Sequence, residues 1–148
     1  MTEQEWMECA DPTPMLEFLE WKPDDRKILL FGIDCCERIS ALHRDRVSLD
    51  APAMRRRLAD EPAAESQLLR CIYGNPFRPV TVNPAWLIPN VTTLARIIFD
   101  RKAFEEMPDL ADALEMAGCN NDDMLAHCRK PGEHVRGCWV VDLILEKE

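Results

Sequence analysis

The chain has 148 residues and a mass of 17.0 kDa, with 47% hydrophobic and 30% charged side chains and a formal net charge of −9. These values are typical of one globular domain that can fold without disulfides or a metal, and they exclude a disordered or fibrous chain. No apolar run approaches the ~18 residues of a membrane span, the acidic start lacks the plan of a secretory signal, and the negative field disfavours general nucleic-acid binding.

Helix signals dominate the first half of the chain. A short helix follows Pro12 and is expected to end near Trp21. The longest helix begins at Asp24 or Asp25, and its apolar positions recur at spacings of three and four residues: Ile28, Phe31, Cys35, Ile39 and Leu42. This spacing places the apolar side chains on one face, which predicts an amphipathic helix.

The next region is charged and interrupted by prolines. Residues 44–61 contain Pro52, so we expect a charged loop or a short helix there. Pro62 then begins a better helix, which ends at Gly74 because glycine is common just past a helix C-terminus. Residues 74–80 contain two prolines, which predicts irregular backbone.

The second half of the chain predicts further short helices. They are expected over residues 83–87, 89–107, 109–118 and 121–130, each bounded by proline, glycine or a capping residue. The last helix, over residues 134–147, is apolar nearly all round and should be buried. The sequence therefore predicts an all-α fold: a single compact domain over residues 1–148, with seven or eight short helices packed around the C-terminal helix.

The number of cysteines indicates whether the protein belongs to a reducing or an oxidising compartment of the cell. Seven cysteines is an odd number, without the regular framework of a small secreted protein. Since no export signal is recognisable, we expect reduced thiols and a cytoplasmic location. Most of these cysteines would then pack as small buried apolar side chains.

Histidines and cysteines gather near the C-terminus. Five side chains that can bind zinc fall within residues 119–138: Cys119, His127, Cys128, His134 and Cys138. His134 and Cys138 are four apart, which would place both on one helix face, and Cys119 or His127 could complete a tetrahedral set. The spacings match no established zinc finger and no Cys-x-x-Cys is present. Two interpretations remain: packed cysteines with capping histidines, or a zinc site formed by Cys119, His127, His134 and Cys138.

A catalytic interpretation of the same residues is weaker. His134, Cys138 and Asp142 follow at intervals of four residues, but a nucleophilic triad needs the histidine between the nucleophile and the carboxylate. A cysteine-dependent enzyme would need His127 or His43 to approach Cys138 from elsewhere in the fold. No catalytic residue is assigned.

One basic cluster stands out in the acidic chain. Six arginines lie between residues 38 and 57, at positions 38, 44, 46, 55, 56 and 57. They indicate either a solvated helix and loop or a patch for an anionic partner that includes Arg55, Arg56 and Arg57. No aromatic residue is interleaved for base stacking, which makes nucleic acid the less favoured partner.

Six segments together resemble a family of small proteins abundant in planctomycete-type genomes. They are MTE-x-EW at residues 1–6, PMLEFL at 14–19, CC-x-RI at 35–39, GNPFRP at 74–79, LADALE at 110–115 and HVRGCW at 134–139, where x stands for any residue. The resemblance spans both ends of the chain. Residues 44–66 depart from it, because members of that family carry a longer alanine-rich helical insert there. The family has no established activity, so the resemblance implies no mechanism.

The expected function is a non-enzymatic protein-interaction or adaptor module whose partner is another protein. The absence of a recognisable cofactor loop, triad or ordered metal motif favours it, and no cofactor is assigned. The first alternative is a small zinc-binding or cysteine-dependent enzyme that uses His134 and Cys138. The second is an accessory protein that contacts nucleic acid through the arginines at 38–57.

Overall fold

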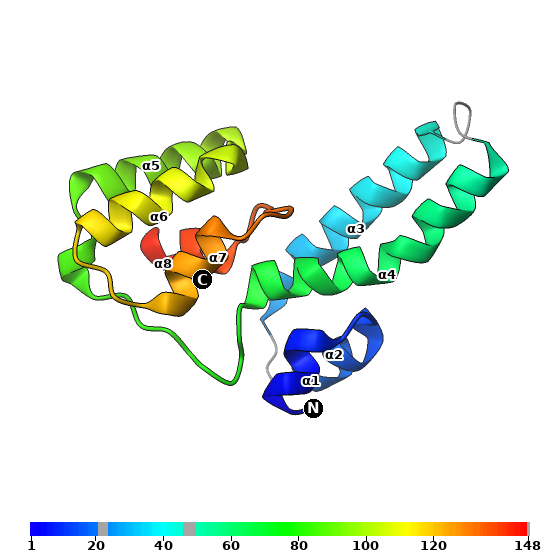
Figure 1. The fold of residues 1–148 in the computed structure, drawn as a ribbon, viewed down its shortest axis with the longest axis horizontal. Coiled ribbons are helices and arrows are strands. Elements are labelled where there is room, and N and C mark those ends of the chain that lie inside the picture. The colour runs from blue at the N-terminus through cyan, green and yellow to red at the C-terminus, as the bar shows by residue number, and fades with distance from the viewer. Residues whose placement is uncertain (21–23, 46–49, 148) are drawn as a thin grey trace. The chain divides into compact units, whose positions relative to one another are not determined.

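The structure, a computed structural model, describes residues 1–20, 24–45 and 50–147. In these ranges it contains eight α-helices, two short 3-10 helices and no strand, which confirms the predicted all-α class (Figure 1). None of the described helices is both long and apolar enough to cross a bilayer. The elements in chain order are α1 (Glu3–Glu8), α2 (Pro12–Leu19), α3 (Asp25–Asp45), α4 (Ala51–Tyr73), η1 (Pro84–Trp86), α5 (Pro89–Arg101), η2 (Phe104–Glu106), α6 (Met107–Met116), α7 (Asp122–Arg129) and α8 (Trp139–Ile144).

The helices gather into two compact units, Met1–Arg70 and Cys71–Glu148. In the first unit, Trp6 of α1 is fully buried and its ring lies 6.2 Å from that of Phe18 in α2. The Arg70 side chain of α4 donates a hydrogen bond from Nε to the Trp6 carbonyl at 2.9 Å. The short N-terminal helices are thus held to α4 by both an aromatic contact and a hydrogen bond. The predicted helix end near Trp21 lies outside the described residues.

Helix α4 differs from the sequence prediction. Of the charged loop or short helix expected over residues 44–61, the loop is wrong for residues 51–61, which form the first half of the long helix α4, and residues 46–49 lie outside the described ranges. Pro62 lies inside this helix and does not begin it. An interior proline costs a helix ~3 kcal/mol, and the packing of the buried Leu68, Leu69 and Ile72 further along α4 helps to offset this cost.

A substitution at Asp50 tests whether α4 begins at residue 51. Asp50 Oδ1 accepts a hydrogen bond from the Ala53 N–H at 2.8 Å, as an N-cap residue does. We expect Asp50→Ala to lower the free energy of unfolding by ~0.5–2 kcal/mol, measured by urea denaturation. Asp60→Ala, at an exposed position inside α4, is the matched control and should not destabilise the protein. Equal effects of the two changes would argue against a helix start at residue 51.

The second unit has a core contributed by all of its α-helices. Helix α6 contacts both α5 and α7, and α5 also contacts α8. The fully buried side chains of this core include Val91, Ile98, Met107, Leu110, Leu114, Met124 and Val140. This core holds α7 and α8 in place at the positions from which two candidate metal ligands project.

The last helix is shorter than predicted. Helix α8 covers Trp139–Ile144, whereas the sequence predicted a helix over residues 134–147. Gly137 has φ of +96° and Gly132 has φ of +146°, and this glycine-specific backbone keeps residues 130–137 out of a helix. Trp139, Val140, Val141 and Ile144 are buried as expected. That the other helices pack around this one remains a prediction.

Candidate metal centre

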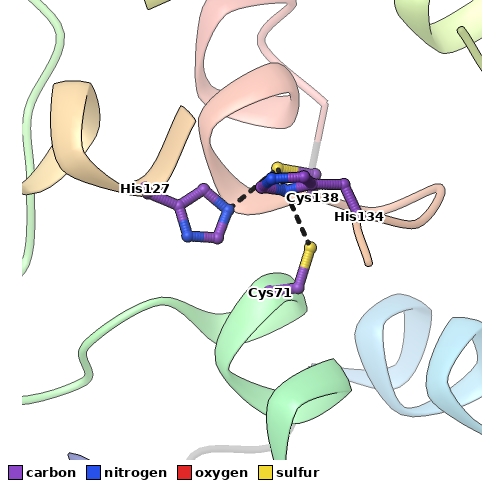
Figure 2. Close-up of side chains that lie close together, drawn as sticks. All are labelled: Cys71, His127, His134 and Cys138. Atoms are coloured by element: carbon purple, nitrogen blue, oxygen red, sulfur yellow. Dashed lines mark hydrogen bonds between the residues drawn. The ribbon is translucent and has the colours of Figure 1, made fainter. Parts of the chain in front are cut away.

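Two cysteines and two histidines converge in the second unit (Figure 2). They are Cys71, His127, His134 and Cys138, and their ligand atoms all lie within 4.8 Å of one another. Among the described residues this is the one cluster of histidine, cysteine and acidic side chains with the closeness that a metal ion requires.

Each ligand comes from a different local structure. Cys71 lies in the last turn of α4, His127 in the last turn of α7, and Cys138 immediately before α8. His134 lies in the turns between α7 and α8. There the Cys138 N–H donates to the Val135 carbonyl at 2.9 Å, and this tight turn folds His134 back toward Cys138. The expectation that His134 and Cys138 share a helix face is therefore wrong, and the turn brings them together instead.

Cys138 is the centre of the cluster. Its Sγ lies 3.3 Å from His127 Nε2 and 4.0 Å from His134 Nδ1. Cys71 Sγ lies 3.8 Å from His134 Nδ1. The two histidine rings meet edge to face with centroids 4.9 Å apart. Both cysteines are buried, with exposed fractions of 2% and 1%, and both histidines are half-buried.

The thiol pKa of Cys138 is shifted in the opposite direction from that of the neighbouring Cys128. Burial alone would raise the pKa of the Cys138 thiol, but hydrogen bonds from Cys71, His127 and His134 hold that pKa well below its usual value. Burial and the nearby Cys138 and Cys119 instead raise the pKa of Cys128. Since the thiolate is the form that binds metals, this environment favours the metal-binding form of Cys138; Cys128 does not belong to the cluster.

The structure brings together three of the four metal ligands named from the sequence. His127, His134 and Cys138 belong to the cluster, but Cys119 does not, and Cys71 occupies the fourth position. Cys71 is 63 residues from His134 in the chain, so no local spacing could indicate it. It is also buried on the apolar side of α4 beside Ile72, like a cysteine that serves only in packing.

The four ligand atoms suit one tetrahedral ion. Zinc binds sulfur at ~2.3 Å and nitrogen at ~2.0–2.1 Å, so the ligand atoms of a tetrahedral site lie about 3.3–3.8 Å apart. The ligand atoms lie within 4.8 Å of one another, which is about 1 Å beyond this range. Two thiolates and two imidazoles are a ligand set that zinc prefers.

The arginines named from the sequence lie in the first unit. Arg55, Arg56 and Arg57 are exposed on α4, and Arg57 forms an ion pair with Asp45 at the end of α3. Arg38 lies 3.7 Å from Glu61. Arg46 is outside the described residues. Acidic neighbours thus offset part of the positive charge, and a patch for an anionic partner remains a prediction.

Native thiol labelling tests the burial of the cluster. In metal-free reduced protein we expect a maleimide to modify the exposed Cys36 fast and the buried Cys71 and Cys138 slowly, while all seven cysteines react in denaturant. Cys35 should also react slowly, because burial raises its pKa to about 11. Peptide mass spectrometry after short labelling times gives each rate. A Cys138 rate as fast as that of Cys36 would indicate an accessible nucleophile.

Comparison with known proteins gives no guide to function: no protein family, no curated protein and no solved structure matches this chain. The resemblance to the planctomycete-type family therefore remains a prediction. The chemistry of the clustered side chains is the strongest remaining indication of what the chain does.

Proposed function

We propose that the protein is a non-enzymatic zinc-binding interaction module, in which one Zn²⁺ held by Cys71, His127, His134 and Cys138 stabilises the second unit. The observation that carries this proposal is the convergence of two sulfur and two imidazole nitrogen atoms within 4.8 Å. A zinc ion there would connect the end of α4, the end of α7 and the start of α8. Binding free energy of such an ion contributes directly to folding.

A structural role suits this ligand set better than a catalytic one. Structural zinc sites have four protein ligands, whereas catalytic sites keep one position open for water or substrate. Here the protein supplies four ligands, and both sulfur atoms are buried. Such an ion would act as a cross-link, which is why the proposal is non-enzymatic.

The interaction part of the proposal is supported by α3. Four aliphatic side chains of this helix are more than 40% exposed: Ile28, Leu29, Ile33 and Ile39. Exposed apolar side chains grouped on one element are typical of surfaces that contact another protein. Another protein is therefore the kind of partner that we propose.

Metal analysis of untagged protein tests the zinc site. After reconstitution with zinc sulfate and gel filtration, we expect one zinc ion per chain by elemental analysis. Cys71→Ser should lose this zinc. Cys119→Ser is the matched control, since Cys119 is also buried but lies outside the cluster, and it should keep the ion. If Cys71→Ser kept its zinc and Cys119→Ser lost it, the fourth ligand would be Cys119, as the sequence analysis suggested, and Cys71 would not be a ligand.

A cysteine-dependent enzyme is the second candidate. It is favoured by the 3.3 Å contact between Cys138 Sγ and His127 Nε2, which resembles a thiol with its general base. The 1% exposure of Cys138 argues against it, because a substrate must reach the sulfur. Fast labelling of Cys138 in the thiol experiment above, without zinc binding, would favour this candidate over the structural zinc site.

A further inference from the structure

The two cysteines of the metal centre are close enough to react with each other. Cys71 Sγ and Cys138 Sγ lie within 4.8 Å of each other, and both sulfur atoms face His134 Nδ1, at 3.8 and 4.0 Å. Figure 2 shows the two side chains approaching from the end of α4 and from the residue before α8. A disulfide has a sulfur–sulfur bond of ~2.03–2.05 Å, so its formation would draw the two side chains closer together.

The pair also has the arrangement that disulfide formation needs. Oxidation begins when one cysteine attacks the oxidant, and a second cysteine must lie close by to complete the disulfide. Cys71 Sγ lies within 4.8 Å of Cys138 Sγ, so Cys71 is in position to act as the resolving partner. Cys119 and Cys128 do not belong to this cluster.

The segment of the chain next to His134 is exposed to solvent. Residues 129–133 are exposed and lead directly to the half-buried His134, whose ring lies against Cys138. Residues 130–137 form no helix, and two of their glycines have positive φ. A local opening of this segment would move His134 aside and admit a small oxidant.

We infer that the centre is a redox-dependent zinc switch, in which a Cys71–Cys138 disulfide and the bound zinc ion exclude each other. This inference rests on the proposed zinc site and adds its regulation. The disulfide uses the two sulfur ligands, and the two remaining imidazoles hold zinc far more weakly. The disulfide would still join the end of α4 to the start of α8, so the oxidised chain keeps its cross-link after the metal leaves.

The chemistry balances with hydrogen peroxide as the oxidant. The Cys138 thiolate attacks one peroxide oxygen, the O–O bond breaks, and a sulfenic acid forms as hydroxide leaves. The Cys71 thiolate then attacks the Cys138 sulfur, the S–S bond forms, and a second hydroxide leaves. Two electrons pass from the sulfur atoms to the peroxide, two protons from solvent convert the hydroxides to water, and Zn²⁺ is released.

The experiment treats zinc-loaded full-length protein with hydrogen peroxide and follows zinc release with a chromogenic chelator. We expect one zinc ion released per chain, and a peptide pair joined through Cys71 and Cys138 in non-reducing mass spectrometry. Dithiothreitol with added zinc should restore the loaded protein. The control Cys36→Ser, which removes an exposed thiol outside the centre, should release zinc at an unchanged rate.

Two results would overturn the switch and leave the zinc site standing. One is zinc that stays bound while exposed cysteines oxidise, and the other is zinc release without the Cys71–Cys138 link. A chain that never binds zinc in the reconstitution experiment would contradict the proposed function itself, and the switch with it. The failures of the two proposals are thus distinguishable.

Discussion

Replacing Cys138 with serine is expected to remove the zinc ion and to lower the melting temperature of the zinc-loaded protein by about 10 °C or more. A ligand present at ~1,000 times its dissociation constant stabilises the folded state by about 4.1 kcal/mol, and 1 kcal/mol shifts the melting temperature by ~2–8 °C for domains of this size range. The serine hydroxyl in a site where the native side chain is 1% exposed adds a cost of about 1–3 kcal/mol.

The measurement is a pair of thermal melts, with added zinc and with a chelator. The native protein should melt at a lower temperature in the chelator, whereas Cys138→Ser should melt at the same temperature in both. Cys36→Ser, at an exposed position, should behave like the native protein. Equal melting of the native protein under both conditions would show that no metal contributes to its stability.

Trp139→Ala is expected to lower the free energy of unfolding by about 3–5 kcal/mol, the usual cost of removing a large buried aromatic side chain. Trp139 is 9% exposed, and its ring centroid lies 5.4 Å from that of His127. Gly74 packs so closely against the indole that an added Cβ would lie 3.1 Å from the ring atoms. The change would therefore open a cavity beside His127, a candidate metal ligand, as well as in the core.

Urea denaturation of Trp139→Ala and of Met116→Ala measures this effect. Met116 is 85% exposed on α6, so its replacement should change the free energy of unfolding by no more than ~0.5 kcal/mol. A small effect of Trp139→Ala, together with the fluorescence of a solvated indole in the native protein, would instead place α8 on an open surface. That result would contradict the core described for the second unit.

The sequence by itself determined the features that depend on neighbouring residues. Caps, prolines and apolar spacing act over one or two helical turns, and they predicted the all-α class and most helix positions in residues 83–130. His127, His134 and Cys138 were also identified, because residues within about ten positions of one another on short helices and turns stay close in most folds. Gly137 is a local signal against a helix that starts at residue 134, and the prediction of a helix over residues 134–147 did not use it.

Only the tertiary structure decided the fourth ligand and the course of α4. Cys71 joins His134 across 63 residues, and this approach depends on how the last turn of α4 packs in the second unit, which no periodicity encodes. Only the structure shows that Cys119 is not one of the four candidate ligands. Its spacing in the sequence suits a zinc ligand, but its side chain is buried outside the cluster. Pro62 remained inside a helix because the free energy of the whole of α4, with its Asp50 cap, exceeds the local cost of one proline. Both features depend on contacts between residues far apart in the sequence, and these contacts form only when the chain folds.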